Sequence, residues 1–193
     1  MRLYIVGGPG SGKSTIANAL SQRLGIPVVH LDDHWSGIFE RPRPAGWTWS
    51  PTAARYRDSF VADCLARESW IVEGAEPPFL TAFAEACDLI VWCDVPFRVA
   101  AMRMIRRHVL ADLARTNAYP GYRRLYGFLR SVRRRYAKET KRPADEWTAW
   151  TRSQVAEGST RYAGKVIRLN GSTSASTLRR VLERVAGTTC RPT

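Results

Sequence analysis

The chain has 193 residues, of which 45% are hydrophobic and 24% are charged. These values exclude an intrinsically disordered chain and suit a single folded domain over residues 1–193. The sequence contains no apolar run near the roughly 20 residues that span a bilayer, and its start is too short and glycine-broken for a signal peptide. We therefore expect a cytoplasmic protein without a membrane partner.

The net charge of +13 is concentrated in one segment of the chain. Residues 98–142 contain 14 lysines and arginines against two acidic residues, a local balance of +12. The four cysteines form no C-x-x-C pair, so we expect reduced thiols without a chemical role. An anionic ligand attracted by this charge is therefore expected to bind at residues 98–142.

Strand and helix patterns alternate along the chain. Short apolar runs predict strands at 2–6, 27–31, 70–74, 88–96 and 165–170. Helices are predicted at 15–25, 51–68, 78–87 and 176–187, with a long basic helical stretch over roughly 97–156 and a loop rich in tryptophan and proline after the second strand. This alternation indicates an α/β fold with a five-stranded parallel sheet.

A phosphate-binding motif follows the first strand. Gly7-x-x-x-x-Gly12-Lys13-Ser14 fits G-x-x-x-x-G-K-[ST] and lies between a predicted strand and a predicted helix, as this P-loop motif requires. Its backbone N–H groups can surround phosphates at a helix N-terminus. We expect Lys13 to reach the β- and γ-phosphates of ATP and Ser14 to ligate Mg²⁺. The predicted nucleotide-binding residues are Gly8, Pro9, Gly10, Ser11, Gly12, Lys13, Ser14 and Thr15.

The remaining sequence narrows the class of P-loop protein. A GTPase is expected to carry N-K-x-D and D-x-x-G, and neither string occurs in this chain. Motor and transporter ATPases are normally larger modules with further signatures. A small P-loop kinase therefore fits the sequence best.

Several strings resemble the adenylate-kinase-related P-loop kinases. They are the P-loop, "VVHLDDHW", "SWIVEG" and "LIVWCDVPFRVAAMRMIRR", and together they cover about residues 1–107. The likeness is greatest to the group named DNA topology modulation proteins, a name that describes a phenotype. The resemblance implies a three-layer α/β/α fold like that of nucleoside monophosphate kinases. It also implies phosphoryl transfer to a small acceptor. We therefore expect a Mg·ATP-dependent kinase that acts on a hydroxyl or phosphate of a nucleoside, nucleotide, sugar or antibiotic, as a monomer or homodimer.

Two carboxylates are candidates for the catalytic base. Asp32 and Asp33 follow the second strand, at the carboxyl edge of a parallel sheet where the P-loop also lies. Either could accept the proton of the acceptor hydroxyl, and the family position favours Asp32. The alternative is a helix cap or an Asx turn.

Glu73 and Asp94 are rival metal-holding residues. Glu73 ends the third strand, where related kinases hold Mg²⁺ through water, and Asp94 ends the fourth. We favour Glu73 for the metal, together with Ser14, and place Glu73 near the substrate. The alternative for Glu73 is a salt bridge to the basic segment.

The basic segment divides into two helical patterns. In the first, Met102, Ile105 and Val109 form an apolar stripe. Arg103, Arg106 and Arg107 lie on an adjoining face and could clamp phosphates. We expect Arg103 and Arg107 to act in catalysis, Arg106 to bind substrate, and residues 98–156 to form a basic helical lid.

The second pattern has an apolar stripe of Leu125, Phe128, Leu129, Val132 and Tyr136 with arginines around it. Three explanations stay open for these arginines: a solvated helix face, recognition of an anionic substrate, and nucleic-acid binding. The last defines an alternative function, a nucleic-acid-binding P-loop NTPase that uses residues 98–142.

Aromatic residues cluster between the second strand and the following helix. Trp35, Phe39, Trp47 and Trp49 lie within fifteen residues. They suggest a stacked substrate wall containing Trp35 and Trp47 or, equally, a small satellite core. "NGSTSAS" at 170–176 follows the last strand, where related kinases place the loop that packs on adenine.

Overall fold

The computed structural model describes residues 1–36, 51–74, 77–137, 152–171 and 175–189. Its strands are β1 (Arg2–Gly7), β2 (Val28–His30), β3 (Trp70–Glu73), β4 (Leu89–Cys93) and β5 (Val166–Leu169). Its helices are α1 (Lys13–Leu24), α2 (Leu31–Ser36), α3 (Pro51–Leu65), α4 (Pro77–Ala86), α5 (Phe97–Leu113), α6 (Tyr122–Tyr136), α7 (Arg152–Arg161) and α8 (Ala175–Thr189), with a 3₁₀ turn at Ala163–Lys165. In the described helices, no segment is both long and apolar enough to cross a membrane.

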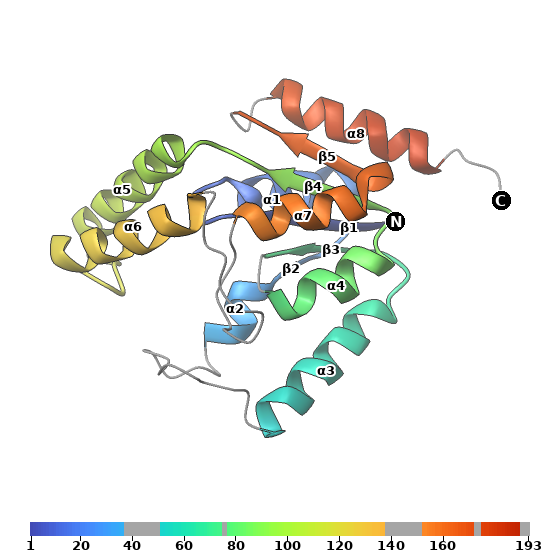
Figure 1. Ribbon diagram of the computed structural model, residues 1–193, viewed down its shortest axis with the longest axis horizontal. Helices are drawn as coiled ribbons and strands as arrows, with labels where there is room; N and C mark the ends of the chain where they lie inside the picture. Colours follow the sequence, from blue (N-terminus) through green and yellow to red (C-terminus); the bar gives the residue numbers. More distant parts are fainter. Residues whose placement is uncertain (37–50, 75–76, 138–151, 172–174, 190–193) are drawn as a thin grey trace.

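The five strands form one parallel sheet in the order β2-β3-β1-β4-β5. β1 is the central strand, so the P-loop that follows it lies between the carboxyl ends of β3 and β4 (Figure 1). This order brings together residues from four separate parts of the sequence at one edge of the sheet.

Helices cover both faces of this sheet. Leu3 and Ile5 of β1 point into a core with Ile16 of α1 and Val181 of α8. Tyr4 and Val6 of β1 point into the opposite core, which contains Phe83 of α4 and also residues of α3, α5, α6 and α7. Successive strand residues face opposite sides, so both faces are apolar. The predicted three-layer α/β/α fold is confirmed.

Helices α5 and α6 pack against each other and project from one side of the sheet (Figure 1). They are joined by a turn that includes Pro120 and Gly121, and Gly121 has φ +105°. Leu129, Val132 and Tyr136 of α6 pack on the core, as the second apolar stripe predicts, while Phe128 is 42% exposed. Over the described residues 97–137, the basic segment is therefore a helical hairpin, fixed to the core by Ala100 and Met104 of α5 and by the C-terminal half of α6.

Three sequence-based predictions are wrong in detail. Residues 31–36, expected as a strand end at 31 and a loop after it, form α2, because Asp32 and Asp33 place negative charge in its first turn, where the helix dipole favours it. Met102 and Ile105, expected in a buried stripe, are exposed, since α5 packs through Ala100 and Met104. The last helix continues past Gly187 to Thr189.

Candidate active site

The P-loop has the backbone geometry of a phosphate cradle. Gly10 and Gly12 have φ values of +76° and +93°, a region that side chains disfavour, so the chain can curl between β1 and α1. A Cβ on Gly10 would also lie 2.6 Å from the Ala100 carbonyl oxygen, because α5 approaches the loop closely. The first N–H groups of α1 follow at once, which suits anion binding.

Two side chains from the α5–α6 hairpin hold the P-loop from outside. Arg103 of α5 donates from Nη1 to the Ser11 carbonyl at 2.9 Å and to the Gly10 carbonyl at 3.4 Å. Tyr136 of α6 donates its hydroxyl to the Pro9 carbonyl at 3.0 Å. These bonds hold the carbonyls of Pro9, Gly10 and Ser11 outward, while within the loop the Ser11 N–H donates to the Gly8 carbonyl at 3.1 Å.

A polar cluster forms at the carboxyl end of β3, beside the P-loop. The buried Glu73 accepts a hydrogen bond at Oε1 from Ser14 Oγ at 2.9 Å, and His30 Nδ1 lies 2.8 Å from the same oxygen. Lys13 Nζ lies 3.5 Å from Glu73 Oε2. No hydrogen bond reaches Oε2 from the described residues, which leaves one carboxylate oxygen of Glu73 able to accept a further ligand.

Asp32 completes this cluster from the first turn of α2. Its Oδ2 lies 3.5 Å from Lys13 Nζ, and the side chain is 63% exposed. A carboxylate that is both solvent-accessible and beside the P-loop lysine can contact a reacting group near the γ-phosphate. The structure thus brings Lys13 and Ser14 of α1, Asp32 of α2 and Glu73 of β3 together from three elements. No ion pair with Lys13 is found for Asp33, which is exposed and has other interactions.

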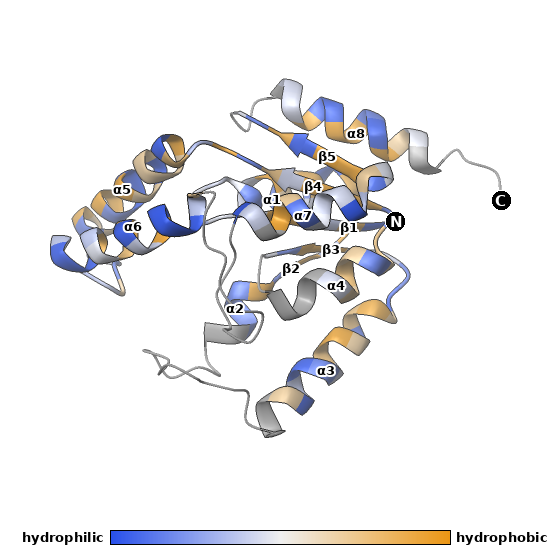
Figure 2. Ribbon diagram, viewed as in Figure 1, coloured by the Kyte–Doolittle hydropathy of each residue, from blue (hydrophilic) through white to orange (hydrophobic). Residues whose placement is uncertain are grey.

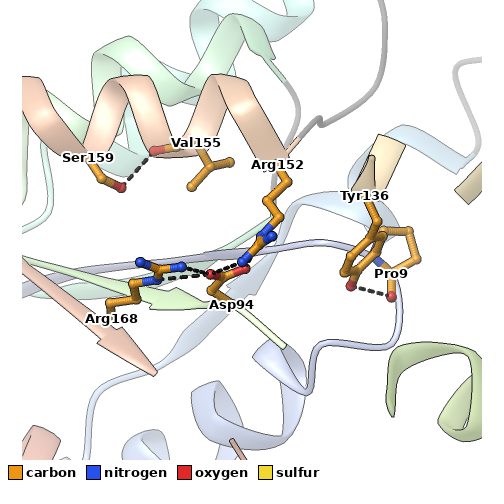
Figure 3. Close-up of polar contacts among 7 residues, drawn as sticks. All are labelled: Pro9, Asp94, Tyr136, Arg152, Val155, Ser159 and Arg168. Carbon is orange, nitrogen blue, oxygen red and sulfur yellow. Dashed lines mark hydrogen bonds and ion pairs between the residues drawn. The ribbon is translucent and has the colours of Figure 1, made fainter. Parts of the chain in front are cut away.

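Asp94, at the end of β4, has a different environment (Figure 3). Arg152 of α7 binds it through Nε at 2.6 Å and Nη2 at 2.8 Å, and Arg168 of β5 donates from Nε at 2.9 Å and from Nη2. Arg168 also stacks over Trp92, 4.7 Å from its ring centre. Burial alone would raise the pKa of Asp94, but the hydrogen bonds from Arg152 and Arg168 outweigh it and hold this pKa below its usual range.

The other predicted site residues lie apart from this cluster. Arg106 and Arg107 are exposed on α5 and form no ion pair with any described residue, whereas Arg103 contacts the P-loop. Trp47 and residues 172–174 of the expected adenine loop lie outside the described residues, as does the side chain of Trp35. Cys64, Cys87 and Cys93 are buried free thiols, and burial raises the pKa of Cys93 to about 12.

Sequence reasoning did not predict the contacts that His30, Tyr136 and Arg152 make in the site. His30 ends β2 two residues before Asp32, a signal that it shares the same edge of the sheet. Tyr136 was recognised only as the last residue of an apolar stripe, although its hydroxyl needs a partner when buried. Arg152 gave no local signal, because its partner Asp94 lies 58 residues away.

The cluster suits a hard divalent cation at Ser14 and Glu73. A hydroxyl and a buried carboxylate with an unbonded oxygen are the oxygen ligands that Mg²⁺ takes, usually with several waters. Asp94 fits this role poorly, because two guanidinium groups already occupy both of its oxygens. In the described residues, no group of three histidines, cysteines or acidic residues is arranged for a metal.

Structural comparison finds the same fold in known kinases. Shikimate kinase from Aquifex aeolicus matches with a TM-score of 0.52 and 19% identity over all of both chains. Shikimate kinase from Acinetobacter baumannii in complex with shikimate matches with a TM-score of 0.56 and 14% identity, over 98% of this chain and 95% of that one. At these identities the likeness concerns the fold.

Sequence comparison adds relatives and a family. Adenylate kinase 2 from Synechocystis sp. is 34% identical over 85 residues, which cover 38% of this chain and 47% of that protein. The chain spans about half to two thirds of the length of the adenylate kinases it matches. These relatives and the shared fold identify a P-loop protein similar to small-molecule kinases. The AAA domain family model matches residues 2–174, and the chain belongs to that family.

Proposed function

We propose that this protein is a Mg·ATP-dependent kinase that transfers the γ-phosphoryl group to a small-molecule acceptor. The observation that carries the proposal is the convergence of Lys13, Ser14, Asp32 and Glu73 beside the P-loop. A nucleotide phosphate, a metal and an acceptor each need one of these groups in phosphoryl transfer. We also propose that the protein is related to the DNA topology modulation group and that this group consists of kinases.

The position of Asp32 favours a hydroxyl acceptor over a phosphate acceptor. A carboxylate 3.5 Å from the P-loop lysine can take the proton of an attacking hydroxyl. An anionic phosphate needs no such base, and like charge would repel it. Among nucleosides, nucleotides, sugars and antibiotics, we therefore expect a compound phosphorylated on oxygen of a hydroxyl group.

The mechanism assigns one task to each residue. Lys13 and the N–H groups of the P-loop bind the β- and γ-phosphates, and Ser14 and Glu73 would hold the metal. When bound, Mg²⁺ supplies charge neutralisation at these phosphates. Asp32 accepts the hydroxyl proton as the acceptor oxygen bonds to the γ-phosphorus, the bond to the β-phosphate oxygen breaks, and ADP leaves.

We further propose that α5 contributes arginines to the reaction. Arg103 holds the P-loop, and Arg107, four residues later, carries a guanidinium without an ion-pair partner in the described residues. Such a group can make bidentate contacts with phosphoryl oxygens, and Arg106 can do so for the substrate. Residues 98–156 would then act as the basic lid of the site within a single-domain chain. The protein would act as a monomer or a homodimer.

Transfer of labelled γ-phosphate tests this function. Wild type and Lys13→Ala are incubated with Mg·ATP and nucleosides, nucleoside monophosphates, sugars or aminoglycosides. We expect a labelled product with a hydroxyl-bearing acceptor, and its formation should fall by at least about 10²-fold in Lys13→Ala. Hydrolysis of ATP without any labelled acceptor, at a rate changed by nucleic acid, would instead support the nucleic-acid-dependent NTPase.

A further inference from the structure

The outward face of α6 combines positive charge with exposed aromatic rings. We infer that this face binds single-stranded nucleic acid, with arginines on the phosphates and tyrosines against the bases. The inference goes beyond the proposed kinase activity and does not depend on it. None of the residues involved contacts Lys13, Asp32 or Glu73 among the described residues.

The two sides of α6 differ in composition. Leu129, Val132 and Tyr136 pack on the core, and the half-buried Leu125 continues the same stripe at spacings of three and four. By the 3.6-residue period, the surface beside this packed side presents two tyrosines and four arginines, all exposed, within about a third of the helix circumference: Tyr122, Arg123, Tyr126, Arg130, Arg133 and Arg134. Figure 2 shows hydrophilic stretches along α6, including the end of the helix next to the turn that joins it to α5.

The two tyrosines present unusually accessible rings. Tyr122 and Tyr126 are 70% and 68% exposed and lie one helical turn apart. Tyr122 has a tilted contact with His108 of α5, with ring centres 6.1 Å apart, and Tyr119 in the turn before α6 is 62% exposed. An exposed ring can stack on a base of any kind, because every base has a π-face.

The positive charge of this face is not neutralised within the hairpin. Among the described residues 97–137, the one acidic residue is Asp112. It lies on α5, where it pairs with His108 at 3.2 Å and accepts a hydrogen bond from Asn117 at 2.7 Å. The arginines of α6 therefore present a positive potential to a polyanion.

Single-stranded nucleic acid matches this face better than other polyanions. From Tyr122 to Arg134 the helix extends about 18 Å, the length of a few nucleotides. Rings between guanidinium groups suit a strand in which bases and phosphates are both accessible, whereas a duplex hides the faces of its bases. An anionic bilayer would instead require aliphatic side chains for insertion on the same face. The large hydrophobic residues of this face of α6 are tyrosines.

Fluorescence anisotropy with a labelled 20-mer of oligo(dT) tests the inference on the full chain. We expect binding that weakens steeply with salt. In the R130Q/R133Q/R134Q variant, the slope of log K against log[salt] should fall by about 2, since each lost phosphate contact removes about 0.7. R23Q/R67Q/R179Q removes the same charge from exposed positions elsewhere and should leave the slope unchanged.

The tyrosines are tested separately. Y122A/Y126A should weaken binding by roughly 5-fold or more per stacked base, while Y122F/Y126F should bind like wild type because the rings remain. Circular dichroism verifies that each variant is folded. The inference is overturned if oligo(dT) does not bind at low salt, or if both triple variants bind alike. It is also overturned if an equal-length duplex or phosphatidylglycerol vesicles bind more tightly than oligo(dT).

Discussion

Glu73 and Asp94 are two buried carboxylates with opposite surroundings. Glu73 is the last residue of β3 and Asp94 directly follows β4, the strands on either side of β1, so both lie next to the P-loop. Glu73 is contacted by a serine, a histidine and a lysine and retains an oxygen without a hydrogen bond from the described residues. Asp94 is bound by two arginines. Burial of a carboxylate beside a P-loop therefore does not identify a metal site, because its partners decide its role.

The largest effect is expected at the Glu73 side of the P-loop, in Asp32→Asn. If Asp32 is the base, turnover falls by about 10²–10⁴-fold, with little change in ATP affinity, since Lys13 and the P-loop remain. Asp33→Asn is the matched control and should retain most of the activity. Labelled phosphate transfer and ATP titration measure the two quantities, and equal loss in both variants would contradict the assignment.

Asp94→Asn should affect stability more than chemistry. The variant leaves Arg152 and Arg168 without their carboxylate, and we expect the free energy of unfolding to fall by about 2 kcal/mol. The loss is moderated because both guanidinium groups reach solvent. Urea unfolding measures it, with the exposed Asp58→Asn as control, expected within about 0.5 kcal/mol of wild type. A stable but inactive Asp94→Asn would make Asp94 catalytic.

The contribution of Asp94 to the free energy of unfolding should decrease as the pH falls. The folded-state pKa of Asp94 lies below its unfolded value. Its contribution is therefore fully present above the unfolded pKa of about 4 and is lost as the pH falls through the lower, folded pKa. Unfolding of wild type and Asp94→Asn should differ most near neutral pH and converge in acid. If the difference in unfolding free energy between wild type and Asp94→Asn grew in acid, the pKa of Asp94 would not be lowered by folding.

The smallest effect is expected in Tyr136→Phe. It removes the hydrogen bond to the Pro9 carbonyl and keeps the ring that packs on Phe97. The expected cost is about 1 kcal/mol of unfolding free energy, with weaker ATP binding if the bond also fixes the P-loop. Tyr126→Phe, on the exposed face of the same helix, is the control. Equal stability and ATP affinity in both variants would remove the role of Tyr136.

The sequence predicted the fold well because its signals are local. The five apolar runs became five strands, and the P-loop motif lies between β1 and α1 as expected. The positions of Asp32 and Glu73 beside the P-loop could be predicted, because both lie at the carboxyl ends of strands. The partners of Asp94 could not be predicted, because Arg168 lies 74 residues away and its pairing depends on the strand order. Met102 and Ile105 are exposed because α5 packs on the core through a different side, which carries Ala100 and Met104.

The magnesium dependence of phosphoryl transfer in Glu73→Gln and Asp94→Asn tests the central claim most directly. If Glu73 holds the metal, Glu73→Gln should raise the Mg²⁺ concentration for half-maximal rate by about 10-fold or more, in the range seen when a metal site is weakened. Asp94→Asn should leave that concentration unchanged. A shifted magnesium dependence in Asp94→Asn, with a normal one in Glu73→Gln, would contradict the roles assigned to the two carboxylates.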